Sequence, residues 1–300
     1  MALSINDGVS KVMSDQVEQS SFVITMSCPD NAGIVAATTS CLADQGCFII
    51  EAAHFADTGA QTFFGRVVFR LTSEQQSIDG VEAAFSAVAQ KFRMVWALRD
   101  QSKKKRVLLM VSKFGHCLND LLHRYRTHAL PMEVSAVVSN HTAMQSLAYW
   151  HGVDFHHLPI TPKTKFDQEE RLREIISETG SDFIVLARYM QILSPEFSRD
   201  FFPRVINIHH SFLPGFKGAR PYHQAYERGV KLIGATAHFV TEDLDEGPII
   251  EQSVERVDHT RTPDQLVAVG RDIENVVLAR GLQAVLEDRV LLNGIRTVIF

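Results

Sequence analysis

The sequence predicts an α/β protein of two domains, a small βαββαβ unit followed by a doubly wound, mostly parallel sheet. Three observations lead to this prediction. The chain has 300 residues, a length that favours two domains. Its apolar runs alternate with segments of helical periodicity, which is typical of α/β folds. A polar and charged stretch at residues 101–105 separates one such series from the next, so we expect a linker there.

The first domain is predicted over residues 21–100, after a flexible tail over residues 1–20 that carries little periodicity. Strand-like runs rich in β-branched and aromatic residues surround two segments with apolar residues at helical spacing. In chain order we expect a strand at 21–26, a helix from 34 that ends before Gly46, strands at 47–56 and 62–71, a helix at 81–92 and a strand at 94–98. This βαββαβ order is that of the ferredoxin-like split βαβ unit.

The second domain is predicted over residues 106–300, where strands and helices alternate. Continuous apolar runs such as Val107–Val111 indicate strands buried on both faces, which is typical of a parallel sheet. We expect strands at 107–111, 134–138, 155–158, 183–187, 205–208, 233–240 and 249–256, and helices at 118–126, 143–151 and 168–179. A capping box over Thr262–Gln265 opens a long last helix, and a hairpin around Asn293-Gly294 ends the chain.

Composition and charge exclude several classes of function. The formal net charge of -5 is unlike that of a nucleic-acid-binding protein, which needs a basic face. No apolar stretch is long enough to span a bilayer, and the first residues lack the apolar core of a signal peptide. We therefore expect a cytoplasmic protein with no membrane partner. Its four cysteines form no CxxC pair and are expected to be reduced thiols.

Asn207 and His209 are the first candidate functional residues. The strand at 205–208 runs into them, and ligands of open parallel sheets bind beyond the carboxyl ends of the strands. Side chains two residues apart in a strand point the same way, so an amide and an imidazole are expected side by side. The alternative is that both residues only hold the following loop by hydrogen bonds.

Asp245 is the second candidate, because it precedes Gly247-Pro248 in an acidic loop that follows a strand carrying His238. The alternative is that Asp245 only forms the turn. A metal site built from this aspartate and the nearby histidines is not predicted, since no spacing matches a known ligand pair. The histidines considered are His209, His210, His223 and His238.

Four segments, Arg188–Pro195, Asn207–Pro214, Gly218 and His238–Pro248, together resemble the formyltransferase family that uses 10-formyltetrahydrofolate. The resemblance covers about residues 106–287 and implies a sheet of formyltransferase type. It implies Asn207, His209 and Asp245 as the catalytic residues, with no metal and no cofactor besides the folate substrate. The folate-binding residues that it implies are Met190, Gln191, Ile192, Leu193, His238, Val240, Thr241 and Glu242. Trp150 and the phenylalanines are predicted to lie in the core rather than to stack on the folate.

The first domain resembles an ACT domain, a small regulatory and dimerising module. Asp30, Asn31, Gly33 and Ile34 occupy the position of its ligand loop. The resemblance implies an amino-acid effector at this loop. It also implies a homo-oligomer, either a dimer or a larger even assembly.

Water is the expected acceptor of the formyl group. Glycinamide ribonucleotide formyltransferase carries a Gly/Ser-rich loop after its first strand that cradles a phosphate, and small residues are needed there so that backbone N–H groups approach the anion. Here residues 112–119 hold one glycine among bulky Phe114, His116 and Leu118. We therefore expect hydrolysis of 10-formyltetrahydrofolate to tetrahydrofolate and formate, which supplies formate for purine synthesis and balances the one-carbon pool. The alternatives are formyl transfer to an amine and a non-catalytic folate sensor.

Overall fold

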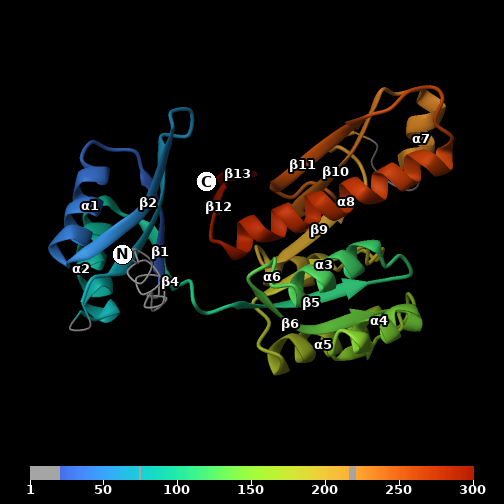
Figure 1. The fold of residues 1–300 in the computed structure, drawn as a ribbon, viewed down its shortest axis with the longest axis horizontal. Coiled ribbons are helices and arrows are strands. Elements are labelled where there is room, and N and C mark those ends of the chain that lie inside the picture. The colour runs from blue at the N-terminus through green and yellow to red at the C-terminus, as the bar shows by residue number, and fades with distance from the viewer. Residues whose placement is uncertain (1–20, 74–75, 216–220) are drawn as a thin grey trace, which may run out of the picture. The chain divides into compact units, whose positions relative to one another are not determined.

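The computed structural model describes residues 21–73, 76–215 and 221–300, so the tail predicted over residues 1–20 lies outside the described residues. Contacts divide the chain into two compact units, and the second begins at Lys104 and runs to Ile299. The linker therefore ends one residue before its predicted end, because Lys105 already belongs to the first strand of the second unit. Each unit is coloured by sequence position in Figure 1.

The first unit is a four-stranded antiparallel sheet in the order β2-β3-β1-β4 with two helices, which confirms the predicted βαββαβ order. Its elements are β1 (Ser21–Pro29), α1 (Ile34–Asp44), β2 (Cys47–Asp57), β3 (Thr62–Leu71), α2 (Ile78–Phe92) and β4 (Val95–Asp100). Both helices pack on one face through a core that includes Ile34, Leu42, Phe69 and Phe85. Helix α2 begins three residues before the predicted start because Ser77 caps it and accepts a hydrogen bond from the Asp79 amide.

The second unit is built on a seven-stranded sheet in the order β11-β10-β9-β8-β5-β6-β7. Five neighbouring strands are parallel and β10 is antiparallel to both of its neighbours, so the predicted doubly wound, mostly parallel sheet is confirmed. The strands are β5 (Lys105–Val111), β6 (Met132–Ser139), β7 (Phe155–His157), β8 (Phe183–Leu186), β9 (Val205–His209), β10 (Leu232–Phe239) and β11 (Ile249–Arg256). The hairpin β12 (Val290–Asn293) and β13 (Arg296–Ile299) forms a separate two-stranded sheet.

Helices cover both faces of this sheet. One face carries α3 (His116–Arg126), α4 (Gln145–Trp150), α7 (Pro221–Arg228) and α8 (Pro263–Leu286), and a short 3₁₀ turn (Thr142–Met144) precedes α4. The other face carries α5 (Lys165–Glu178) and α6 (Pro195–Phe201). Helix α8 starts with the predicted capping box. The sequence analysis missed α6 and α7, which are too short to show helical periodicity.

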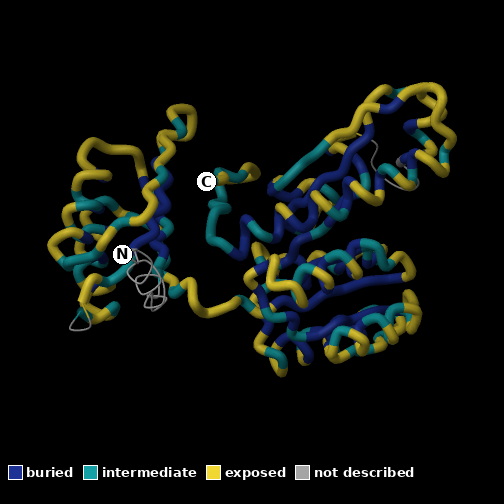
Figure 2. The backbone as a smooth tube through the Cα atoms, in the orientation of Figure 1, coloured by how far each residue is buried: buried dark blue, intermediate teal, exposed yellow. Residues whose placement is uncertain are grey.

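The core lies on both sides of the central strands. In β5, Val107, Leu109 and Val111 contact the α3 and α8 side while Leu108 and Met110 contact the α5 side, so the strand is buried throughout. Figure 2 shows these buried strands between helices that are exposed on their outer surfaces. The prediction of a core position was wrong for Trp150, whose side chain is 68% exposed at the end of α4 and lies under the Arg126 guanidinium. It was also wrong for the exposed phenylalanines, which are Phe48, Phe55, Phe114, Phe166, Phe202 and Phe212.

No helix in the described part of the chain is long and apolar enough to cross a membrane.

Candidate active site

Strands β9 and β10 bring together three of the predicted functional side chains. Asn207 and His209 point to the same face of β9, and His238 of the antiparallel neighbour β10 lies opposite Asn207 in the register. The Asn207 Nδ2 atom is 3.2 Å from His238 Nε2. An amide and two imidazoles therefore lie side by side at the carboxyl end of β9, where ligands of open parallel sheets bind.

Asp245 reaches this group from the loop between β10 and β11. Its Oδ1 atom lies 3.2 Å from His209 Nδ1 and 3.7 Å from His238 Nε2. The backbone at Asp245 has a φ of 57°, in the left-handed region that aspartate tolerates better than most residues. The structure thus brings the predicted trio of Asn207, His209 and Asp245 together, with His238 as a fourth member.

The two imidazoles control the charge of Asp245. Burial by itself raises the pKa of this carboxyl, since the side chain is only 10% exposed. Hydrogen bonds and charges from His209 and His238 outweigh burial and bring the pKa well below its usual value. The carboxylate is therefore ionised at neutral pH, and its Oδ1 atom accepts from the histidines beside it.

His209 presents one ring nitrogen to the site. Its Nδ1 faces Asp245, whereas Nε2 is buried and has no hydrogen-bond partner among the described residues. A buried polar atom without a partner costs free energy unless a ligand satisfies it. The carboxylate holds the ring so that Nε2 is available to a bound substrate or water.

His238 acts on Asn207. The Nδ1 atom of His238 lies 2.8 Å from the Phe239 carbonyl oxygen, so this nitrogen carries the hydrogen and donates it. The Nε2 atom of the same ring faces both the Asn207 amide nitrogen, at 3.2 Å, and the Asp245 carboxylate, at 3.7 Å. An amide nitrogen carries two hydrogens, so beyond this contact Asn207 keeps an N–H that can donate into the site.

The predicted folate-binding residues line a narrow cleft of about 60 Å³ beside the trio, with one exception. Met190 lines a neighbouring cavity instead and is 52% exposed. Those at the cleft are Gln191, Ile192, Leu193, His238, Val240, Thr241 and Glu242. Glu242 also makes a bidentate ion pair with Arg199 of α6, at 2.9 and 2.7 Å.

Two side chains of α5, which the sequence analysis did not single out, hold the loop at residues 188–194 by hydrogen bonds. Gln168 of α5 donates a hydrogen bond to the Tyr189 hydroxyl at 2.7 Å, and Glu169 accepts one from the Ser194 amide at 2.8 Å. Burial raises the pKa of Tyr189 to about 12, so its hydroxyl stays neutral. The signal that could have identified Gln168 and Glu169 is that they are polar residues on the buried face of an amphipathic helix.

The four histidines of this region divide between two places, and His209 and His238 are the two that face Asp245. His210 and His223 line the cavity that also contains Met190, not the cleft beside Asp245. The pKa of His210 is lowered to about 3, first by burial and then by the charge of Arg188, so its ring is neutral.

The residues predicted for effector binding lie in the turn before α1. Asp30, Asn31 and Gly33 are exposed, and Gly33 has a φ of 90°, which favours glycine. The Ile34 side chain is 1% exposed in the core of the first unit, so it does not face that turn.

Gly247 sets the path of the Asp245 loop, because an added Cβ atom would lie 1.7 Å from the Phe239 carbonyl oxygen. We expect Gly247→Ala to displace the loop, lower stability by roughly 1–3 kcal/mol through overpacking and reduce kcat by about 10²-fold through misplacement of Asp245. Thermal unfolding and steady-state kinetics check this. Gly80→Ala is the control. Gly80 lies in α2, and an added Cβ atom would make only an ordinary contact of 3.8 Å with Gln45, so this substitution is expected to stabilise the protein. Normal kcat in Gly247→Ala would contradict the role of the loop.

The sheet and the amide, imidazole and carboxylate at its edge place the chain among the formyl transferases, and the formyl transferase family matches residues 105–282. A formyltetrahydrofolate deformylase from Corynebacterium sp. (strain P-1) is 50% identical over 287 residues, which are 96% of this chain and 99% of that protein. The chain therefore belongs to the formyltetrahydrofolate deformylase family.

Solved structures agree with this membership. A formyltetrahydrofolate deformylase from Burkholderia mallei superposes with a TM-score of 0.89 at 53% identity and covers 94% of this chain and 99% of its own. Glycinamide ribonucleotide transformylase 1 from Symbiobacterium toebii has a TM-score of 0.63 at 31% identity over 68% of this chain and 98% of its own. The transformylase therefore matches only part of the chain, as the sequence resemblance implies.

Proposed function

We propose that the protein hydrolyses 10-formyltetrahydrofolate to tetrahydrofolate and formate. The observation that carries the proposal is the cluster of Asn207, His209 and Asp245 beside a narrow cleft, in a chain whose relatives are named for this reaction. The formate released is available to purine synthesis, and the tetrahydrofolate returns to the one-carbon pool.

In the proposed mechanism, the pteridine side of the folate binds in the cleft lined by Gln191–Leu193 and Val240–Asp245. The formyl carbon then lies at the trio. A water molecule held by the Asp245 carboxylate attacks this carbon, and the carbonyl oxygen becomes an oxyanion. The free N–H of Asn207 and Nε2–H of a protonated His209 donate to the oxyanion, and such donors are usually the largest catalytic contribution.

The intermediate collapses when the bond between the formyl carbon and N10 breaks. Asp245 takes a proton from the attacking water and helps to deliver it to N10, so that tetrahydrofolate leaves as a neutral amine. The formyl carbon leaves as formic acid, which ionises to formate and releases one proton to solvent. Proton transfer of this kind contributes typically about 10²–10⁴-fold to the rate. The trio supplies oxyanion donors and a proton carrier, so the proposed reaction uses no metal and no further cofactor.

Water is the proposed acceptor because the loop that cradles a phosphate in the transformylases carries bulky side chains at residues 112–119 here, which keep its backbone N–H groups away from an anion of that size. His116 begins α3 and its Nε2 lies 2.8 Å from the Glu274 carboxylate of α8. Phe114 lies under two guanidiniums, those of Arg188 and Arg271, at 6.0 and 5.6 Å from the ring centre. His116 and Phe114 stand where small residues would let backbone N–H groups approach a phosphate, so water is favoured over a phosphate-bearing acceptor.

The test is to incubate the purified protein with 10-formyltetrahydrofolate alone and to follow formate and tetrahydrofolate together. Equimolar, catalytic release of both without an amine supports hydrolysis. Release that requires an added amine would favour a transferase, and binding without any release would favour a folate sensor.

We also propose that the first unit binds an amino-acid effector at the Asp30–Gly33 turn. Gly33 precedes α1, and no side chain caps the first amides of this helix. Helix N-termini with open amides favour a carboxylate.

We propose that the protein forms a dimer or a larger even assembly through β2, an edge strand of the first unit. Phe48, Ile50 and Phe55 of this strand are 51%, 53% and 46% exposed. A lysine on such an edge blocks pairing, so Phe55→Lys is expected to shift the mass measured by light scattering to that of a monomer. Ile295→Lys is the control, because Ile295 is 85% exposed at the tip of a different hairpin. An unchanged assembly in Phe55→Lys would contradict pairing through β2.

We place the reaction in the cytoplasm, and the four cysteines of the chain are free thiols, as a reducing compartment requires.

A further inference from the structure

A second cavity lies on the α3 and α8 side of the sheet, whereas the folate cleft lies on the α5 and α6 side. It has a volume of about 380 Å³ and includes His210, Arg188 and Arg271 in its lining. The His210 ring stacks on the His209 ring with the two centres 5.3 Å apart. The cavity therefore lies within one side chain of the reacting centre and is separate from the cleft lined by Asn207, His238 and Asp245.

The Arg188 guanidinium has one ion-pair partner, but not all of its N–H groups make hydrogen bonds. Its side chain is 11% exposed, and its Nε atom lies 3.4 Å from the Glu274 carboxylate. Both Nε and Nη1 are buried without a hydrogen-bond partner among the described residues. Buried N–H groups of a charged side chain are costly when they make no hydrogen bond.

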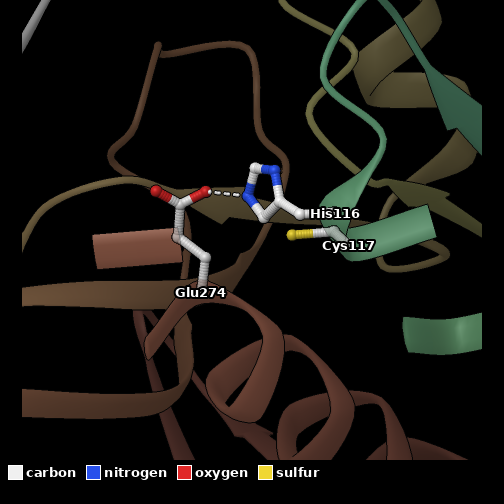
Figure 3. Close-up of side chains that lie close together, drawn as sticks. All are labelled: His116, Cys117 and Glu274. Atoms are coloured by element: carbon white, nitrogen blue, oxygen red, sulfur yellow. Dashed lines mark hydrogen bonds and ion pairs between the residues drawn. The ribbon is translucent and has the colours of Figure 1, made fainter. Parts of the chain in front are cut away.

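Among the described residues of the lining, the only carboxylate is that of Glu274, and it is already engaged. Glu274 receives His116 Nε2 at 2.8 Å on one oxygen and the Tyr222 hydroxyl at 2.8 Å on the other. Figure 3 shows His116 and Glu274 facing each other from α3 and α8, with Cys117 beside them. With one carboxylate against the guanidiniums of Arg188 and Arg271, the lining carries an excess of positive charge.

The same contacts speak against a cation at this place. Ligand atoms of His116, Cys117 and Glu274 lie within 4.8 Å of one another, a spacing that a metal ion can bridge. However, the Arg188 guanidinium stands beside the carboxylate, and burial, followed by the charge of Glu274, raises the pKa of the Cys117 thiol well above its usual value. The thiolate is the form that binds metals, so the chemistry of the cavity is that of an anion site.

We propose that this cavity binds formate, the carboxylate product, and that Arg188 with Arg271 holds the anion as it leaves the reacting centre. The inference rests on the proposed hydrolysis, which releases formate and tetrahydrofolate from one point. Tetrahydrofolate occupies the cleft on the other side of the sheet, so the two products leave on separate sides. Guanidinium pairs with carboxylates through paired N–H groups, which suits both arginines to this role.

The test is a titration of the full-length protein with ¹³C-formate, without folate, followed by the width of the formate NMR line at constant ionic strength. The double variant Arg188→Met with Glu274→Gln removes the guanidinium without leaving its buried carboxylate partner charged. We expect its formate affinity to fall by about 10-fold or more, the value of one hydrogen bond to a charged group. Arg271→Met, an exposed position, is expected to lose about 3-fold.

Arg126→Met is the matched control, because Arg126 also lies over an aromatic ring, that of Trp150, beside an unrelated cavity. Its formate affinity is expected to equal that of the wild type. An absence of saturable binding in the wild type would overturn the proposal, as would unchanged affinity in both cavity variants. Formate release from 10-formyltetrahydrofolate by the same preparation reports separately on the proposed function, so failure of the formate site and failure of hydrolysis are told apart.

Discussion

Asp245→Asn is expected to reduce kcat by about 10²–10⁴-fold, the range of general acid–base contributions. Asparagine has the same shape, but it takes no proton from water and cannot hold a positive charge on His209. Because asparagine keeps the shape of this side chain in the lining of the cleft, the affinity for tetrahydrofolate is expected to stay near that of the wild type. Single-turnover kinetics and product binding measure the two quantities separately.

Glu246→Gln is the control for this prediction, since it neutralises the neighbouring carboxylate, which is exposed and does not line the cleft. Its kcat is expected to match that of the wild type. Near-normal turnover in Asp245→Asn would remove Asp245 from the mechanism.

The lowered pKa of Asp245 makes the stability of the protein depend on pH, and this dependence reports the interaction of Asp245 with His209 and His238. A carboxyl whose pKa is lower in the folded than in the unfolded protein stabilises the fold above its ordinary pKa of 3.8, and this contribution is lost as the pH falls through the folded value. Asp245→Asn is therefore expected to be less stable than the wild type at pH 7. The difference is expected to shrink as the pH is lowered below 3.8.

Asn207→Ala is expected to reduce kcat by about 10²–10³-fold, the cost of one oxyanion donor. KM is expected to change little, because the donor acts on charge that develops only in the transition state. Asn207→Asp keeps the shape and places a negative charge against the oxyanion, so its loss is expected to be at least as large. Steady-state kinetics on both variants check this.

Asn119→Ala is the control for the amide, because Asn119 is exposed on α3 and is expected to be replaceable without loss. A change in KM alone in Asn207→Ala would contradict its role as an oxyanion donor and assign it to substrate binding.

Most of the fold was predictable because burial leaves a direct pattern in the sequence. Strands such as β5 are buried on both faces and appear as continuous apolar runs. Boundaries were less certain, since the cap at Ser77 moved the start of α2 and the short helices α6 and α7 carry too few residues for a period. Trp150 was assigned to the core from its residue type, but its exposed ring lies under an arginine, and this cation–π contact leaves no pattern in the sequence.

The site was predictable where its residues lie close in the sequence or match the family motif. Asn207 and His209 are two residues apart in a strand, so their side chains were expected on the same face. Gly247-Pro248 indicated that Asp245 lies in a loop. The contact between Arg188 and Glu274 was not predictable, because these residues are distant in sequence and meet only when α8 packs on the sheet. A single glutamate on the buried side of α8 was the only signal.

Direct attack of water on the formyl group is tested most directly by one turnover in H₂¹⁸O. We predict that the formate released carries one ¹⁸O atom from solvent, that tetrahydrofolate forms in equal amount, and that both signals are lost in Asp245→Asn. Formate without solvent oxygen, or a formyl group retained on the protein as a mass increase, would contradict hydrolysis by a water molecule held at Asp245.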